Sequence, residues 1–308
     1  MEEIKMEASE FIAKAYDSNA FTTAQASAGY INPEIWNKEV LAHVKANLVV
    51  APLGKVYNDL LDKPGDTLNI TVGVEPAAGA AVAESDAVTI TAFQKTQVVF
   101  SPSEYGAAYQ LTNKEKSRSF INLMQDMTAQ LGYQLALKKD TVCVALLQAS
   151  AGNSVVANGV ASTDIASTDT IDYDDIVNAK KEIMKDKLIP KFLIVGAEQY
   201  ADLLKLEAFR DASKFGGDVA KNGFIGRVSG LDVYWTTQIT PATSKAKALM
   251  LGVDGSGVSS FGICQKSNPY LETEYHALER YTDIVAMEDY AVKLLRANGI
   301  CSIESYAA

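Results

Sequence analysis

The longest uninterrupted helical pattern in the chain covers residues 113–150, and it constrains the fold more than any other stretch. It contains no proline and one glycine, Gly132. Its apolar side chains return at helical spacing, at Phe120, Met124, Met127, Leu131, Leu135, Val142, Leu146 and Ala149. A single helix of this length would measure roughly 50 Å. Because helices in globular proteins usually run about 8–20 residues, we expect a structural spine with other elements packed along it.

The composition and charge exclude several classes of function. The chain has 308 residues, 48% of them hydrophobic, which is enough for one large domain or two small ones. Lys and Arg total 28 against 38 Asp and Glu, giving a net charge of −10. This balance argues against tight nucleic-acid binding over the whole surface, although a weak contact on one face stays open. No segment approaches the ~20 apolar residues of a membrane helix, so we expect no membrane partner.

The cysteines and the start of the chain indicate its compartment. Cys143, Cys264 and Cys301 lie far apart in apolar runs without CxxC spacing, so we expect reduced, buried thiols. Residues 1–20 are acidic and lack the basic and apolar regions of a signal peptide. These features predict a protein that stays inside the cell.

Two stretches of alternating polarity predict a long β-hairpin. Their apolar positions are Leu68, Ile70, Val72 and Val74 in residues 67–74, and Val88, Ile90 and Ala92 in residues 87–101. We expect a loose tip of about a dozen residues, a length that is uncommon unless the loop is functional or disordered. Because an isolated two-stranded ribbon is only marginally stable in water, this hairpin needs another surface to lie on.

An α/β unit is expected after a Ser, Thr, Gly and Ala-rich connector over residues 151–170. Asp172 can cap a helix whose inward side chains would be Ile176, Ala179, Ile183 and Met184. We then expect a buried strand at 191–196, a helix at 197–206, a mobile loop at 209–223, and tight turns at Gly226 and Gly230. A buried strand near 248–253 and the strands of residues 259–308 complete the chain.

The residues that carry chemistry form no recognisable catalytic or metal-binding pattern. The two histidines, His43 and His276, belong to no HExxH or Ser–His arrangement. The glycine-rich residues 252–257 lack phosphate-loop spacing and predict a turn. The clustered acids Asp172, Asp174 and Asp175 fit a helix start. We therefore expect no catalytic residue, no metal and no cofactor, and favour a structural or binding protein over an enzyme.

Three stretches carry a resemblance to a known family. They are INPEIWNKEVLAHVKANLVV followed by KPGDTLNITV, NGFIGRVSGLDVYWTTQI, and ERYTDIVAMEDYAVKLLRANGICSIES. With the order of a loose arm, a ribbon, a long helix, an α/β unit and terminal strands, the chain resembles the major capsid proteins of tailed bacteriophages, which have the HK-ninety-seven-like fold. The resemblance covers nearly the whole chain after about residue 30.

This resemblance implies an α+β capsid-type fold with four parts. They are an N-terminal arm (1–65), an extended loop (66–104), a peripheral domain with the spine helix (105–169 and 259–308), and an axial domain (170–258). It implies self-assembly through hexamers and pentamers into an icosahedral shell enclosing double-stranded DNA, located in the virion and assembled in the host cytoplasm. Scaffolding and portal proteins would be partners, with weak or indirect DNA contact. Some members crosslink through lysine, but no local motif marks Lys95 on the ribbon for this, so we expect no crosslink.

Two hypotheses concern subunit contacts. In the first, Glu75, Glu84 and Asp86 on the ribbon tip pair with basic groups of a neighbouring subunit, for which Lys114, Lys116 and Arg118 are candidates. The alternative is that these charges are simply solvated. In the second, the small and polar segment from Phe21 to Tyr30 becomes ordered only across a subunit contact.

Other functions stay open at this point. A cellular nanocompartment shell of the same fold would package an enzyme instead of a genome. A two-domain α/β enzyme would place its cleft near Gly252–Gly257, but no acid–base pair accompanies that loop. A tail or decoration protein would not be expected to contain so long a helix.

Overall fold

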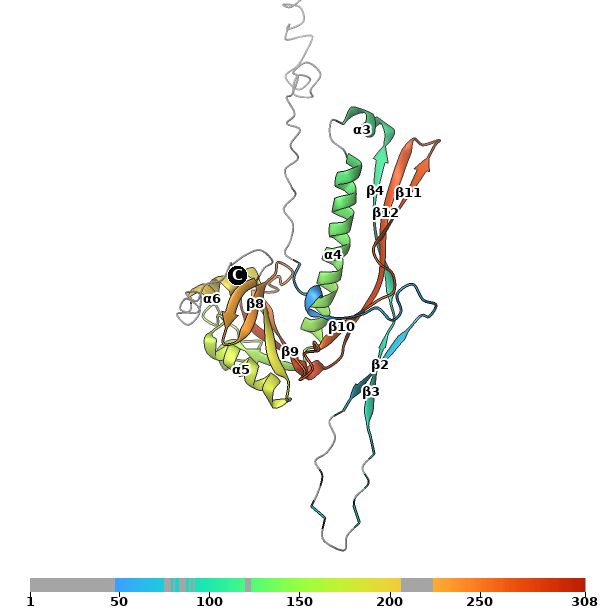
Figure 1. Ribbon diagram of the computed structural model, residues 1–308. Helices are drawn as coiled ribbons and strands as arrows, with labels where there is room; N and C mark the ends of the chain where they lie inside the picture. Colours follow the sequence, from blue (N-terminus) through green and yellow to red (C-terminus); the bar gives the residue numbers. More distant parts are fainter. Residues whose placement is uncertain are drawn as a thin grey trace, which may run out of the picture. The chain divides into compact units, whose positions relative to one another are not determined.

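A five-stranded sheet forms one half of the part of the chain that the computed structural model describes, which is residues 48–74, 79, 81–82, 87–88, 90, 92–119, 123–205 and 224–307. Its strands are β1 (Lys55–Tyr57), β4 (Ser103–Thr112), β10 (Phe261–Gln265), β11 (Tyr270–His276) and β12 (Tyr281–Leu294). The long strand β12 is central, because it pairs antiparallel with β4, β10 and β11, while β1 adds to β10 in parallel (Figure 1).

Helix α4 (Leu123–Ala149) packs along β4 and β12. The contact buries Leu131 and Leu135 of the helix against Ile284 and Ala286 of β12. The expectation of one helix over residues 113–150 is wrong. A separate short helix, α3 (Asn113–Arg118), ends at Ser119, whose backbone is extended (ψ 134°), and α4 with its 27 residues spans about 40 Å.

The buried face of α4 also differs from the expected one in its second half. Asp140, Cys143, Val144 and Leu147 are buried there, whereas Val142 and Leu146 are only partly buried and Ala149 is exposed. This half of α4 packs against the residues that precede β1. Val49 and Val50 share its hydrophobic cluster, and the 3₁₀ turn η1 (Ala51–Leu53) follows them.

A six-stranded sheet with the order β5-β13-β9-β6-β8-β7 forms the second half. Its strands are β5 (Asn153–Val156), β6 (Ile189–Val195), β7 (Phe224–Val228), β8 (Leu231–Trp235), β9 (Lys245–Val253) and β13 (Ile300–Tyr306). The helices of this half are α5 (Tyr173–Lys185) and α6 (Ala197–Lys205), with 3₁₀ turns η2 (Ala157–Gly159) and η3 (Ala297–Gly299). The expected α/β unit is therefore present.

The sequence predictions for α5 are confirmed except at one position. Asp172 caps the helix in a capping box with Asp175, and Ile176, Ala179 and Ile183 are buried. Met184 was expected to point inward, but 59% of it is exposed. The three buried positions follow the i, i+3, i+7 spacing of one helix face, and Met184 lies one residue beyond that face.

The sheet pairing crosses two of the expected domain boundaries. Strand β13 pairs with β9 over seven residue pairs, and β5 pairs with β13 in parallel. Both strands therefore lie in the six-stranded sheet with β6 and β8, although residues 105–169 and 259–308 were assigned to the other half. The connector expected over 151–170 contains β5 and η2.

The ribbon of β2 (Leu68–Gly73) and β3 (Lys95–Phe100) is an antiparallel pair, as predicted, with Leu68 opposite Phe100 and Gly73 opposite Lys95 (Figure 1). The second strand is shorter than expected, since Val88, Ile90 and Ala92 belong to no strand.

The two expected glycine turns differ. Gly230 lies in the β7–β8 turn with φ +80°, as expected. Gly226 is not in a turn: it lies within β7, next to a register shift in the pairing of β7 with β8.

Candidate assembly surfaces

The base of the ribbon packs against the rest of the subunit, whereas apolar side chains on its outer part are exposed to solvent. At the base, Phe100 is buried in a cluster with Leu60, Cys264 and Ala291, and Leu68 packs against them. Farther out, the large apolar side chains that the structure describes are exposed, namely Val74, Val82, Val88, Ile90 and Phe93. Ile90 is 96% exposed, and the ammonium of Lys95 lies 5.0 Å from the centre of the Phe93 ring. An apolar surface of this kind marks an interaction site on a soluble protein.

Helix α3 presents three cations at the end of β4. The Thr112 hydroxyl accepts a hydrogen bond from the Glu115 amide, and the Glu115 carboxylate accepts one from the Thr112 amide, which fixes the start of the helix. The Thr112 hydroxyl also donates a hydrogen bond to the Glu115 carboxylate at 2.8 Å. This bond first, and then the bond from the Thr112 amide, lowers the pKa of Glu115. All residues of α3 are exposed, including Lys114, Lys116 and Arg118. None of the three makes an ion pair with a carboxylate in the described ranges.

Two buried polar side chains of α4 connect it to other elements. The Asp140 carboxylate accepts hydrogen bonds from the backbone amides of Val50 and Ala51, both at 2.8 Å, and thereby caps η1. Burial raises the pKa of Asp140, while hydrogen bonds from the backbone oppose the rise. Lys139 forms an ion pair with the buried Glu288 of β12. Together these contacts fix the segment before β1 and strand β12 to one turn of α4.

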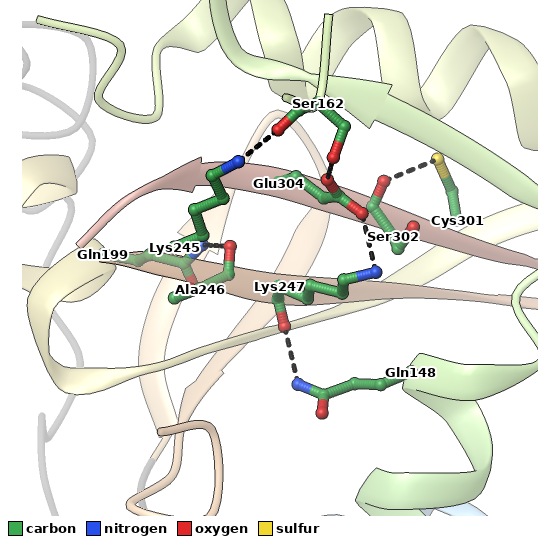
Figure 2. Close-up of polar contacts among 9 residues, drawn as sticks. All are labelled: Gln148, Ser162, Gln199, Lys245, Ala246, Lys247, Cys301, Ser302 and Glu304. Carbon is green, nitrogen blue, oxygen red and sulfur yellow. Dashed lines mark hydrogen bonds and ion pairs between the residues drawn. The ribbon is translucent and has the colours of Figure 1, made fainter. Parts of the chain in front are cut away.

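A polar cluster on β9 and β13 ties down the connector after β5. Figure 2 shows Glu304 between the Ser162 hydroxyl and the Lys247 ammonium, which lies 2.7 Å from the carboxylate. Lys245 donates to the Ser162 carbonyl. Burial alone would raise the pKa of Glu304, but the hydrogen bonds from Lys247 and Ser162 outweigh it and the pKa is lowered. These groups fix the connector on the sheet.

The possible sites of chemistry have structural roles. Asp254 accepts hydrogen bonds from the amides of Ser256 and Val258 at 2.9 Å, so the glycine-rich residues 252–257 form a closed turn. Burial raises the pKa of Cys143 and of Cys301 to about 12, which leaves both thiols protonated. The described residues contain no group of three or more His, Cys, Asp or Glu side chains suited to a metal ion. None of the described helices is long and apolar enough to cross a membrane.

Only part of the expected contact residues can be placed. Lys114, Lys116 and Arg118 lie on α3, as described above. The other five, Glu75, Glu84, Asp86, Phe21 and Tyr30, lie outside the described residues.

An acidic sheet face was missed in the sequence, although its signal was present. Glu272 and Glu274 stand two residues apart in YLETEYH, so they share one face of β11.

Comparisons with known proteins agree on one fold. The capsid asymmetric unit of cyanophage Pam1 superposes with a TM-score of 0.72 and 14% identity, over 94% of this chain and 98% of that chain. A chain of Mycobacterium phage Che8 gives 0.69 and 18%, over 89% and 97%. The capsid of cyanophage P-SCSP1u gives 0.68 and 14%, over 91% and 94%. At these identities the structures show a shared fold, which confirms the capsid-type α+β fold expected from the sequence.

The sequence itself also matches a protein family. No curated protein matches the chain. The family of phage capsid proteins, however, matches over residues 94–303, which is more than half of the chain. This range includes α4, strand β3 of the ribbon, and the strands of both sheets except β1 and the end of β13. The chain therefore belongs to the phage capsid protein family and is a major capsid protein of a virion shell.

Proposed function

We propose that this capsid protein assembles through hexamers and pentamers into an icosahedral shell that encloses double-stranded DNA. The observation that supports this most directly is the ribbon, whose base is anchored on the subunit while Val88, Ile90 and Phe93 remain bare. Such side chains gain burial only against another surface, and each would contribute about 1.5–3 kcal/mol when fully buried. A neighbouring subunit is the surface that a shell supplies to every copy. The role is structural, and we propose no catalytic activity.

The proposed division into parts follows the resemblance. Residues 1–65 act as an arm and 66–104 as the extended loop. The peripheral domain is built from β4, α4 and β10–β12, and the axial domain from residues 170–258. Strands β5 and β13 pair within the axial sheet, so segments on both sides of residues 170–258 in the chain contribute strands to it.

Partners other than the chain itself follow from assembly. We propose that a scaffolding protein and a portal protein take part, and that subunits assemble in the host cytoplasm. Contact with the packaged DNA would be weak or indirect, because the chain carries a net charge of −10 and phosphates repel such a wall.

The subunit contacts expected from the sequence remain proposals. Ribbon-tip carboxylates Glu84 and Asp86, with Glu75, would pair with cations of a neighbour. Their reversal to lysine should impair assembly without changing the melting temperature of the subunit, and normal shells from this variant would refute the pairing. For Phe21–Tyr30, proteolysis should cut free subunits faster than shells, and equal cutting would count against ordering at a contact.

The shell itself is tested by electron microscopy and by analysis of the contents. Negative-stain images of the protein expressed alone, and with the proteins encoded beside it, should show closed shells or hexamer-sized rings. Nuclease-protected double-stranded DNA in purified virions would support a genome container. A packaged enzyme with no nucleic acid would instead identify a nanocompartment, and a monomer under all these conditions would contradict the proposal.

A further inference from the structure

The free end of the five-stranded sheet carries two sets of unmatched charge, and this inference builds on the proposed shell. The end is formed by α3 and by the turn between β11 and β12, residues 277–280. The two are tied together, because the Asn113 amide donates to the Arg280 carbonyl at 2.9 Å and the Asn113 side chain donates to the Tyr275 hydroxyl at 2.8 Å. Both sets of charge are therefore held in fixed positions on one rigid end.

The acidic set lies on the sheet face that α4 does not cover. Glu274 stands opposite Asp283, and Glu272 stands opposite Val285, so all of them point to the same face. Ile284 and Ala286, the alternate residues of β12, pack against α4 on the other face. Glu279 of the turn adds to this set. The side chains of Glu274 and Glu279 are 78% and 63% exposed. We call Glu272, Glu274, Glu279 and Asp283 the acidic face.

The acidic face is poorly neutralised within its own subunit. Among the described residues, His276 is the basic side chain that contacts it. Its Nε2 lies 3.2 Å from Asp283 Oδ2 and 3.9 Å from Glu274 Oε2, and its Nδ1 lies 3.7 Å from Glu279 Oε2. The negative charges of the acidic face also affect the neighbouring Tyr281. The pKa of Tyr281 is raised, first by partial desolvation and then by Glu279 and Asp283. Like charges held this close repel each other and are relieved by a cationic partner.

The basic set lies on the opposite side of the same end. Tyr275, which α3 contacts through Asn113, alternates with Glu274 on β11, so it points to the side that α4 covers. The cations Lys114, Lys116 and Arg118 follow in α3, which connects β4 to α4 (Figure 1). A subunit therefore presents plus charge on one side of the sheet end and minus charge on the other.

Apolar side chains accompany these charges. Leu278, at the extreme of the β11–β12 turn, is 97% exposed, and Tyr275, Leu271 and Tyr270 of β11 are exposed as well. Strand β11 is also an edge of its sheet, since its only strand partner among the described elements is β12. Contacts between proteins commonly combine a central apolar anchor with a charged rim that sets orientation.

We propose that this sheet end is a contact between two copies of the chain, in which the acidic face of one copy binds the α3 cations of the next and Leu278 is buried between them. The contact is heterologous, because different surfaces of the two copies meet. Such contacts repeat from copy to copy and close into rings when the rotation permits. The occupant is a second copy because the same chain carries the complementary cations, already exposed and without an ion pair in the part of the chain that the structure describes.

Zero-length crosslinking tests the contact without requiring complete shells. A carbodiimide joins a lysine amine to a carboxylate only when the two are in contact. Concentrated full-length protein, prepared as an equal mixture of ¹⁴N and ¹⁵N chains, is crosslinked, and mixed-isotope peptides are identified by mass spectrometry. We expect Lys114 or Lys116 joined to Glu272, Glu274 or Glu279 of the other isotope. Crosslinks from these lysines to Glu75, Glu84 or Asp86 alone, or none between chains, would overturn the proposal.

Charge inversion provides the second measurement. Reversal of the α3 cations (K114E, K116E and R118E) or of the exposed acids (E272K, E274K and E279K) should weaken association at least about tenfold in sedimentation, and raised salt should weaken the wild type in the same way. The combined six-residue variant restores opposite signs and should recover association. The control K181E with K191E reverses exposed lysines outside the contact and should associate normally. If the combined variant stays as weak as its parents, the proposal fails. Shells that form in spite of this failure would leave the capsid function intact.

Discussion

Asp140 should be the residue that holds the start of the described fold on α4. Its carboxylate receives the backbone amides of Val50 and Ala51, and η1 has no side-chain cap of its own. The informative perturbation is a pair of substitutions of similar size. Asp140→Leu removes the acceptor, whereas Asp140→Asn retains the accepting oxygen and replaces the second, unbonded oxygen with an uncharged NH₂ group.

The expected magnitude follows from the burial of the two donors. Val50 is fully buried, so its amide cannot find water once the acceptor is gone, and an unsatisfied buried donor costs about 1–3 kcal/mol. Ala51 is only partly buried, so water replaces part of its lost bond. Asp140→Leu should therefore lower the free energy of unfolding by about 3 kcal/mol, and Asp140→Asn by about 1 kcal/mol or less. For a chain of this size, the leucine variant should melt roughly 5 °C lower.

The pH dependence separates charge from hydrogen bonding. Because burial raises the pKa of Asp140, the folded state favours the protonated carboxyl. The resulting stabilisation is fully present below the ordinary pKa of about 3.9 and is lost as the pH rises through the raised value. Asp140→Asn has no such titration, so its stability relative to the wild type should be higher at pH 7 than at pH 3.5.

Hydrogen exchange provides the local assay. Mass spectrometry of a peptide covering residues 48–54 should show faster exchange in Asp140→Leu and near wild-type exchange in Asp140→Asn. If both variants exchange at the same faster rate, the charge and not the acceptor matters. If the leucine variant exchanges and melts like the wild type, the capping argument is wrong.

Two further predictions concern the six-stranded half and the glycines. Glu304→Gln should lower the free energy of unfolding by about 1 kcal/mol at pH 7, because Lys247 loses its charged partner. Since the pKa of Glu304 is lowered, the wild-type advantage is fully present above the ordinary carboxyl pKa and is lost as the pH falls through the lowered one. Urea unfolding at about pH 7 and about pH 3.5 should show a smaller difference at the lower pH, and an undiminished difference would contradict the prediction. Gly152→Ala should destabilise by about 1–3 kcal/mol, because its Cβ would lie 2.7 Å from the Ala297 backbone. Gly132→Ala in α4 meets nothing within 4 Å and should stabilise by up to about 1 kcal/mol, so melting shifts of the same sign would refute the comparison.

The sequence was sufficient where local signals decide the structure. The capping residue Asp172, the alternation at Leu68–Val72 and the turn at Gly230 each act within a few residues, and the structure has the predicted elements there. The break after α3 was missed because residues 113–150 favour helix throughout. The bonds from Asn113 to Arg280 and Tyr275, which hold the start of α3, join residues far apart in the sequence and were not visible in the pattern either.

Contacts between distant parts of the chain could not be predicted in the same way. The helical pattern predicts that Asp140 faces solvent. It is buried instead, because its carboxylate accepts a hydrogen bond from a backbone amide 90 residues earlier in the chain. The pairing of β13 with β5 and β9 likewise joins segments separated by more than forty residues. The acidic face shows the intermediate case, since the spacing of Glu272 and Glu274 was visible but their opposition to Asp283 was not.

The distribution of apolar side chains separates the stability of the subunit from the stability of the shell. Leu131, Leu249 and Ile303 are fully buried within one chain, so they stabilise the subunit whether or not it assembles. Ile90 and Leu278 are almost fully exposed, so they add nothing to the subunit and gain burial only from a partner. Anything that binds the folded chain also raises its apparent stability. Substitutions at Ile90 or Leu278 should therefore leave the melting of free subunits unchanged and lower that of shells, whereas substitutions at Leu131 should lower both.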